Sequence, residues 1–146
     1  CLYLFGEPQA DVCSSVLLDN GADGVCTQIL NYGGFLCTLS SGKVSTTALE
    51  SEIQGEEGTI VIDHIAELRR VTLLKNGEEQ LLGEAHLEND LYYEAKAFRE
   101  MIERQDQTAY EAACGRMLAC VRLLEHGRAQ SGMAYPRISV EKGAFL

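Results

Sequence analysis

Residues 87–136 read LENDLYYEAKAFREMIERQDQTAYEAACGRMLACVRLLEHGRAQSGMAYP, and this stretch decides the fold. Its first part predicts a helix, because large apolar residues recur at the spacing of a single stripe along one helical face. The stripe consists of Leu91, Ala95, Phe98 and Ile102. Asn89 or Asp90 can cap the start, since a short side-chain acceptor there satisfies a free backbone N–H. The polar run 103–107 ends this pattern.

A second helix is expected to begin at Thr108, because Glu111 follows at the spacing of a capping box. Its main apolar stripe consists of Tyr110, Cys114, Met117, Val121 and Leu124. Gly132 and Pro136 are ordinary stop signals for a helix. Two amphipathic helices with stripes to bury need an apolar layer to lie on.

The residues before 87 are expected to supply that layer as a sheet. Alternating or β-branched runs predict strands near 11–19, 25–32, 35–40, 46–54, 59–63, 68–75 and 78–82. Asn76-Gly77 is the clearest local signal, because this dipeptide accepts positive φ at both central positions of a type I′ hairpin turn. The predicted class is α+β: an open, predominantly antiparallel mixed sheet of about six or seven strands, with two C-terminal helices packed on one face. The other face is left for solvent, a second domain or a partner subunit.

Composition places residues 1–146 in one soluble domain, since 46% of them are apolar and 23% are charged. A net charge of −10 argues against a nucleic-acid surface and against anionic membranes. The six cysteines lie mostly at apolar positions without a C-x-x-C motif, which is typical of reduced, buried thiols in a cytoplasmic protein. The apolar run 2–5 followed by Gly6 and Pro8 is how a helix ends, so we expect this chain to be a piece of a longer polypeptide.

Motifs that carry chemistry are scarce. The sequence shows neither a G-x-G-x-x-G nor a P-loop pattern. His64, His86 and His126 have no ligands at metal spacing. Cys114 and Cys120 lie on the apolar stripe of the second helix, where packing explains them better than catalysis. From the residues alone the chain has a fold but no catalytic residue.

Several short motifs resemble one family in their order and spacing. They are Phe5-Gly6-Glu7-Pro8, the strand–turn–strand IQGEEGTI at 53–60, NDLYYEAKAF at 89–98 with Met101-Ile102, and GMAYP at 132–136. Together they resemble the C-terminal domain of the Gfo/Idh/MocA oxidoreductases, the group of glucose–fructose oxidoreductase, inositol dehydrogenase and dihydrodiol dehydrogenase. The resemblance spans nearly the whole chain.

This resemblance implies a two-domain enzyme that acts on a small molecule, a sugar, polyol or related hydroxyl compound. An N-terminal Rossmann domain of the same polypeptide would bind NAD or NADP, so no cofactor is expected in this chain. The family's proton-transfer lysine and its histidine or tyrosine would precede Cys1. Substrate contacts in the family come from the turn before the penultimate helix and its first residues, which correspond here to His86, Asn89, Tyr92 and Tyr93.

The sequence leaves a second interpretation open. A free-standing α+β interaction module, which dimerises or binds a ligand through its open sheet, would also lack a catalytic set. In either case the uncovered sheet face, with its mixture of Val, Leu, Thr and Gln, predicts a symmetric homo-oligomer. A Gly-rich βαβ unit encoded upstream of Cys1 would decide for the oxidoreductase.

Overall fold

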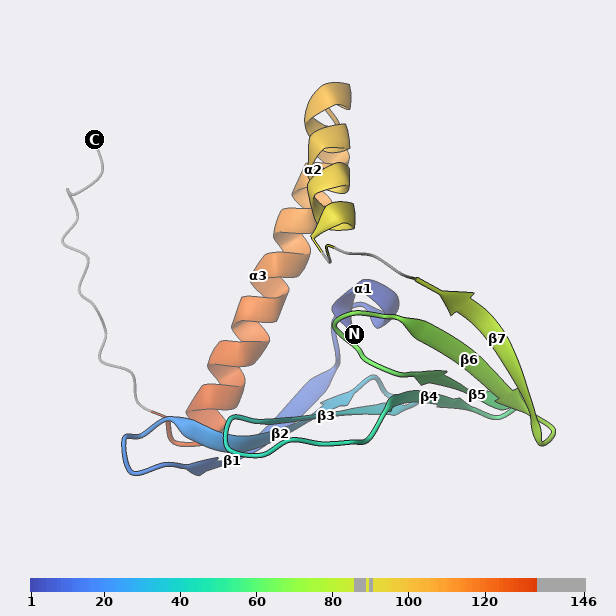
Figure 1. Cartoon of the computed structure of the whole chain (residues 1–146). Helices are drawn as coiled ribbons and strands as arrows, with labels where there is room; N and C mark the ends of the chain where they lie inside the picture. The colour runs from blue at the N-terminus through green and yellow to red at the C-terminus, as the bar shows by residue number, and fades with distance from the viewer. Residues whose placement is uncertain (86–88, 90, 134–146) are drawn as a thin grey trace, which may run out of the picture. The chain divides into compact units, whose positions relative to one another are not determined.

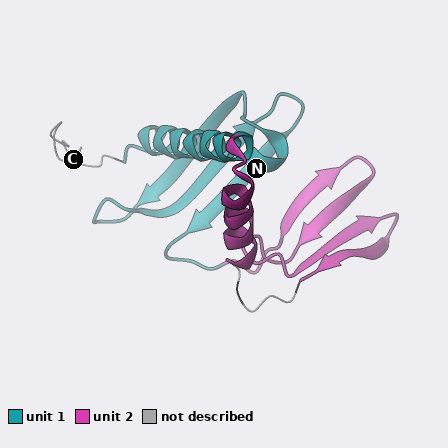
Figure 2. Ribbon diagram, turned by 90° about the horizontal axis from the view of Figure 1, so that it is seen from above, with its two compact units in different colours: residues 1–46, 108–146 teal, residues 47–107 magenta. Residues whose placement is uncertain are grey.

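The computed structural model describes residues 1–85, 89 and 91–133. In chain order the elements are α1 (Leu2–Phe5), β1 (Ala10–Leu17), β2 (Asp23–Asn31), β3 (Leu36–Gly42), β4 (Ser51–Gly55), β5 (Gly58–Ile62), β6 (Arg70–Lys75), β7 (Glu78–Glu84), α2 (Tyr92–Arg104) and α3 (Gln107–Gln130) (Figure 1). The chain divides into two compact units, each with its own sheet (Figure 2). Residues 1–46 and 108–146 form unit 1, and residues 47–107 form unit 2.

The sheet of unit 1 consists of β1, β2 and β3 in that order, with antiparallel neighbours. Its register places Gln28 opposite Cys13 on one side and Leu39 on the other. Side chains that lie directly opposite one another share a face, so these three belong to one face of the sheet. Leu30 lies on the same face and is only 2% exposed, which makes it the centre of this small core.

Helix α1 is held at the end of this sheet by aromatic rings. It ends at Gly6, whose φ of +76° is accessible to glycine at low cost and confirms the expected helix end. The ring of Phe5 packs edge-on against Tyr32 and Phe35, with centroid distances of 5.8 and 5.1 Å. The hydroxyl of Tyr32 donates a hydrogen bond to the carbonyl oxygen of Gly6 at 3.3 Å. These contacts fix α1 against the β2–β3 connection.

Helix α3 meets the sheet of unit 1 with its C-terminal half, on a line of residues that the sequence did not single out. Ala119 and Gly127 are buried and Leu123 is half-buried, four residues apart on one face. A Cβ atom on Gly127 would lie 3.2 Å from Cys13 Sγ, a tight contact, so the absence of a side chain at Gly127 helps the helix to approach β1 this closely.

The predicted stripe of α3 therefore does not face the sheet. At 100° per residue its members lie on the side of the helix opposite Ala119. They remain about half exposed, except Cys114, which is less so: Tyr110, Cys114, Met117, Val121 and Leu124. The expectation that this stripe is buried was wrong, because the closest approach to a strand selects the smallest residues and not the most apolar ones.

The sheet of unit 2 is an antiparallel meander in the order β4-β5-β6-β7. Asn76 and Gly77 join its last two strands with φ values of +54° and +81°, which confirms the predicted hairpin turn. Val61 and Thr72 pair across β5 and β6 and are the buried residues of this sheet. Unit 2 thus has a core only one or two side chains deep.

Helix α2 is the last element of unit 2 in the sequence, and none of its residues is buried. Its predicted stripe forms as a helical face, but Leu91, Phe98 and Ile102 are all more than half exposed. The helix ends at Gln105, whose left-handed φ of +52° reverses the chain within the polar run that was expected to break it. The second expectation of a buried stripe was therefore wrong as well.

The α+β class, the seven strands, the open sheet and the two long C-terminal helices are confirmed. One mixed sheet was expected, whereas the described strands form two sheets in which all pairs are antiparallel. The strand predicted over 46–54 begins only at Ser51, because Thr47 Oγ1 accepts the N–H of Leu49 at 3.0 Å and so favours a turn before it. None of the described helices is both long and apolar enough to cross a bilayer.

Candidate functional site

Of the four residues predicted to contact substrate, Asn89, Tyr92 and Tyr93 are described, and they lie at the start of α2. His86 lies outside the described residues, so its role stays a prediction. Asn89 Oδ1 accepts a hydrogen bond from the backbone N–H of Leu91 at 3.0 Å, and the carbonyl oxygen of Asn89 accepts the N–H of Tyr92 at 3.1 Å. Asn89 therefore forms a local turn just before the helix. The N-cap of α2 is Leu91 and no side chain caps it, so the expectation that Asn89 or Asp90 is the N-cap residue is not confirmed.

Tyr92 and Tyr93 occupy the first turn of α2 with their rings in contact. The centroids are 5.4 Å apart and the planes meet at 71°, an edge-to-face arrangement. Both side chains are exposed, so their hydroxyl groups are open to a ligand. A phenol hydroxyl can both donate and accept hydrogen bonds.

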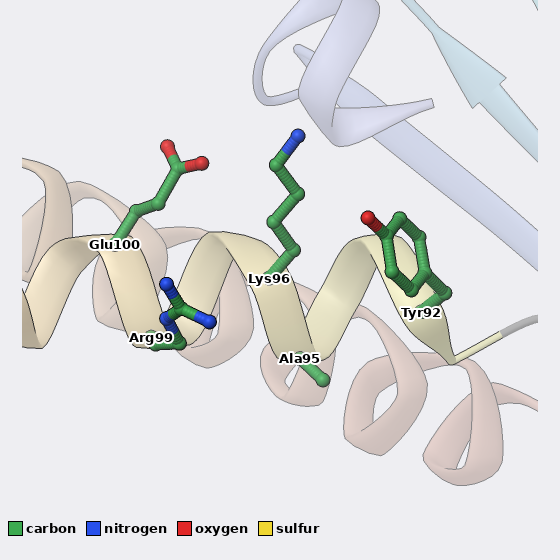
Figure 3. Close-up of a pocket in the computed structure, with 5 residues that line it drawn as sticks. All are labelled: Tyr92, Ala95, Lys96, Arg99 and Glu100. Carbon is green, nitrogen blue, oxygen red and sulfur yellow. The ribbon is translucent and has the colours of Figure 1, made fainter.

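A shallow depression runs along α2 from Tyr92. It is lined by Tyr92, Ala95, Lys96, Arg99 and Glu100 (Figure 3). Tyr92, Lys96 and Glu100 project from the same side of the helix, as their spacing of four residues requires (Figure 3). Arg99 Nε lies 2.8 Å from Glu103 Oε1, so this guanidinium is engaged within the helix. Because every lining residue comes from one helix, the depression is an open surface and not an enclosed cavity.

A second depression lies on one face of the unit 2 sheet. It is lined by Glu50, Val61, Asp63, Arg70, Thr72, Leu74 and Glu79. The guanidinium of Arg70 forms an ion pair with Glu79, and the backbone N–H of Arg70 donates to Asp63 Oδ1 at 3.0 Å. That backbone hydrogen bond is the main reason why the pKa of Asp63 lies below its usual range. These charged groups therefore already have partners within the sheet.

The densest polar network of the described residues lies elsewhere, where α3 meets β1 and β2. Asp11 Oδ1 lies 2.8 Å from His126 Nδ1, and the Asp11 side chain is only 8% exposed. Gln28 Nε2 donates to Asp11 Oδ2 at 3.3 Å and to the carbonyl oxygen of Leu123 at 3.4 Å. The network thus ties the sheet to the helix through one carboxylate and one amide.

Gln130 completes the network on the outer edge of β1. Its Oε1 accepts the backbone N–H of Cys13 at 2.6 Å, and its Nε2 donates to the backbone carbonyl of Asp11 at 3.1 Å. Since β1 is an edge strand, these are backbone groups that no neighbouring strand satisfies. The carboxamide of Gln130 therefore makes the two hydrogen bonds that a peptide group of a neighbouring strand would make on this side of β1.

The chemistry of this network favours positioning over catalysis. A carboxylate–imidazole pair is half of a proton-transfer set, which also needs a nucleophile or a substrate atom within hydrogen-bond reach. The other described side chains that contact Asp11 and His126 are the amides of Gln28 and Gln130, which do not exchange protons at neutral pH. The network therefore fixes where α3 sits on the sheet.

Sequence reasoning missed this network for a physical reason. Asp11 and His126 are 115 positions apart, so no spacing rule connects them. The one available signal was the polar residues Asp11 and Ser15 on the strand face that also carries Cys13, but the prediction of this strand rested on its apolar residues. Among residues 1–85, 89 and 91–133, no three His, Cys, Asp or Glu side chains are placed to hold a metal ion.

Comparison with known proteins relates the chain to oxidoreductases. It is 35% identical over 141 residues to scyllo-inositol 2-dehydrogenase (NADP(+)) IolU of Bacillus subtilis, covering 93% of this chain and 43% of that protein. It is 34% identical over 139 residues to the uncharacterized oxidoreductase YgjR of Escherichia coli, covering 94% of this chain and 42% of that protein. The chain thus spans less than half the length of the curated relatives it matches. No family model matches it.

A solved structure shares the fold at lower sequence identity. UDP-N-acetylglucosamine 3-dehydrogenase GnnA from Acidithiobacillus ferrooxidans superposes with a TM-score of 0.66 at 17% identity. The match covers 89% of this chain and 42% of that one. At this identity the likeness concerns the fold alone, and it again spans only part of a longer protein.

Proposed function

We propose that this chain is the substrate-binding and dimerisation domain of an NAD(P)-dependent oxidoreductase. The premise is that the chain belongs to the Gfo/Idh/MocA oxidoreductases and corresponds to their C-terminal domain. The proposed substrate is a sugar, a polyol or a related hydroxyl compound. The observation that carries the proposal is the 35% sequence identity to a scyllo-inositol dehydrogenase along almost the whole chain. More than half of that relative lies outside the match.

The described residues do not fit a dinucleotide. A Rossmann site needs parallel strands joined by a helix whose N-terminus receives the pyrophosphate, whereas the described strand pairs are all antiparallel. We therefore assign NAD or NADP to an N-terminal Rossmann domain of the same polypeptide. The catalytic residues belong there too, and we assign none within this chain.

The substrate would meet this domain at the start of α2. Tyr92 and Tyr93 offer two adjacent exposed hydroxyl groups, and Asn89 offers its amide; His86 is the fourth proposed contact. Neutral donors and acceptors of this kind suit a neutral polyol, whose hydroxyl groups both donate and accept hydrogen bonds. Their part is to orient the carbon that reacts, while proton and hydride transfer take place on groups of the other domain.

Dimerisation is proposed through the face of the unit 1 sheet opposite α3. The register pairs Val12 with Ile29 and Val16 with Val25 on that face. These four side chains are between 38% and 67% exposed, and Thr27 Oγ1 and Ser40 Oγ hydrogen-bond among them at 3.2 Å. A flat face of β-branched residues with its polar groups paired loses little on being covered by a second copy.

The catalytic part of the proposal is tested on the full polypeptide that contains this chain. We expect it to reduce NAD⁺ or NADP⁺ with at least one member of a panel of inositols, sugars and sugar alcohols. Tyr92→Phe removes one substrate hydrogen bond and should raise KM by about threefold to tenfold with little change in kcat. Tyr3→Phe, the same change at another exposed tyrosine, on α1, is the control. A full polypeptide that binds no dinucleotide would refute the proposal.

Sedimentation at micromolar concentration tests the interface. We expect a dimer, and Val16→Glu should convert it to a monomer because a carboxylate cannot be buried there without a partner. Val44→Glu introduces the same charge at a similarly exposed valine outside the strands and should leave the dimer intact. A wild-type monomer would refute the interface without bearing on the catalytic proposal.

We further propose a cytoplasmic location. All six cysteines are free thiols in the structure, which suits a reducing compartment. The expectation that they are buried was wrong for most of them: Cys13 is buried, but Cys1 and Cys120 are exposed.

A further inference from the structure

Four of the six cysteines form two close pairs in unit 1. Cys1 Sγ and Cys37 Sγ are 3.3 Å apart, and Cys13 Sγ and Cys26 Sγ are 3.4 Å apart. A disulfide bond is about 2.05 Å long, so each pair needs to close by little more than about 1 Å. The sequence shows neither pair, because their members are 36 and 13 positions apart and no C-x-x-C motif joins them.

The Cys13–Cys26 pair is shielded by α3. Cys13 is buried, Gly127 packs directly on its side chain, and Ser131 Oγ donates to its sulfur at 3.5 Å. Burial raises the pKa of the Cys26 thiol, with the hydrogen bond to Cys13 as a further cause. Since the thiolate is the nucleophile in disulfide exchange, both access and reactivity are low at this pair.

The Cys1–Cys37 pair lies under different conditions. Cys1 is exposed and Cys37 is half-buried, so a small oxidant reaches the first sulfur directly. The backbone on both sides is held in place, because the contacts of Phe5 with Tyr32 and Phe35 fix α1 beside the strand that carries Cys37. A second thiol held this close attacks an intermediate much faster than one free in solution.

We propose that Cys1 and Cys37 form a redox modification site, which takes a low-molecular-weight disulfide of the glutathione class as its oxidant and becomes an intramolecular disulfide. The thiolate of Cys1 attacks one sulfur of glutathione disulfide, forms a mixed disulfide and releases one glutathione thiolate. The thiolate of Cys37 then attacks the Cys1 sulfur of that mixed disulfide, and a second glutathione thiolate leaves. The two protein thiols are oxidised, glutathione disulfide is reduced to two glutathiones, and these take up the two thiol protons.

The product would join α1 covalently to β3. At present that attachment depends on the aromatic contacts of Phe5 and on the hydrogen bond from Tyr32 to Gly6. The disulfide therefore makes the position of α1 depend on the redox state, whereas oxidation of Cys13 and Cys26 would only link two strands that are already paired.

The test exposes the whole chain to glutathione disulfide, blocks free thiols with N-ethylmaleimide and maps disulfides by mass spectrometry. Chymotrypsin is required, because the first basic residue is Lys43 and trypsin leaves all four cysteines on one peptide. We expect a Cys1–Cys37 cross-link, with Cys13 and Cys26 alkylated and cross-linked at least about tenfold more slowly. In urea that difference should disappear, because it depends on the fold.

Two variants complete the test. Cys37→Ser removes the resolving thiol, so Cys1 should accumulate as a stable mixed disulfide with glutathione. Cys26→Ser, the matched control from the shielded pair, should form the Cys1–Cys37 cross-link at the wild-type rate. Persistent glutathione on wild-type Cys1 without a cross-link, or a Cys13–Cys26 bond that forms as fast as the exposed one, would overturn the proposal.

Discussion

The two long helices of this protein are stabilised in different ways. Helix α3 is attached to its sheet by Gly127, which allows close contact with Cys13, and by the hydrogen bonds of His126 and Gln130 to Asp11. Helix α2 buries no residue, and the ion pairs recorded along it, such as Arg99 with Glu103, join residues of its own surface. A large apolar stripe is present on both helices, yet it does not determine where α3 binds.

This difference shows which features position a helix on a strand. Small residues set how closely the two backbones approach, and a few buried polar contacts set the rotation of the helix about its axis. Apolar stripes on α2 and α3 that stay half exposed are expected where a further surface exists to cover them. The proposed N-terminal domain and second subunit are candidates for that surface.

The largest expected effect is the difference in unfolding free energy between a substitution in the buried core of unit 1 and one on the surface of α2. Leu30→Ala removes a side chain that is 2% exposed and should lower the free energy of unfolding by about 2 to 5 kcal/mol. Ile102→Ala, at 61% exposed, should cost less than about 1 kcal/mol in this chain. Urea unfolding followed by circular dichroism measures both. If both substitutions lowered the free energy of unfolding equally, α2 would be packed as tightly as the core, and the proposed difference between the two helices would be wrong.

A pair of glycines in α3 tests the contact with β1. Gly127→Gln places a side chain where Cys13 and the amide of Gln28 already lie, so it should destabilise the chain by about 1 to 3 kcal/mol. Gly115→Gln is the matched control, because no atom beyond its own turn of helix lies within 4 Å of the added Cβ. Glutamine favours helix more than glycine does, so this control should gain up to about 1 kcal/mol. A stabilised Gly127→Gln would show that α3 is not seated on β1.

The polar attachment is expected to contribute less. Gln130→Ala leaves the N–H of Cys13 and the carbonyl of Asp11 to water and should cost about 1 kcal/mol in urea unfolding. Gln130→Glu keeps an acceptor for the N–H of Cys13, but it loses the donor to Asp11 and places a second negative charge beside the Asp11 carboxylate. The variant should therefore be less stable than the wild type at neutral pH, and its stability should recover when the new carboxyl group is protonated. A Gln130→Glu variant as stable as the wild type at pH 7 would show that the hydrogen bonds of Gln130 to β1 do not stabilise the chain.

The smallest expected effect compares one aspartate from each unit. The Lys43 hydrogen bond is the main cause that lowers the pKa of Asp23, and the backbone N–H of Arg70 is the main cause that lowers the pKa of Asp63. A carboxyl with a lowered folded-state pKa stabilises the fold above its unfolded pKa, and this contribution is lost as the pH falls through the folded value. Both contributions should therefore disappear below about pH 4.

Salt distinguishes the two aspartates. At about 1 M salt the Asp23 shift should shrink strongly, since its partner is an exposed charge, while the Asp63 shift should persist, since its partner is a backbone dipole. NMR titration of the carboxyl carbons measures both pKa values. Lys43→Gln should reduce the shift of the Asp23 pKa and leave that of Asp63 unchanged, and a loss of both would indicate a shared cause.

Local signals in the sequence predicted local structure well. Asn76-Gly77 gave the hairpin, Gly6 and Gly132 gave the helix ends with φ values of +76° and +71°, and alternation gave the strands to within a few residues. What the sequence did not predict are the particular side-chain contacts between residues far apart in the chain. Glycine and alanine at 127 and 119 carry no hydrophobic signal, so the face of α3 that contacts the sheet could not be identified. The network at Asp11 and the two thiol pairs were invisible for the same reason.

Gln130 has a consequence beyond the stability of one chain. An uncovered strand edge can recruit the matching edge of another molecule, and repetition of that step leads to fibres. By occupying the N–H of Cys13 and the carbonyl of Asp11, one glutamine interrupts the row of free groups in the middle of β1. If α3 moved away from β1, that row would be uncovered, so the hydrogen bonds of Gln130 also protect this edge against pairing with another strand.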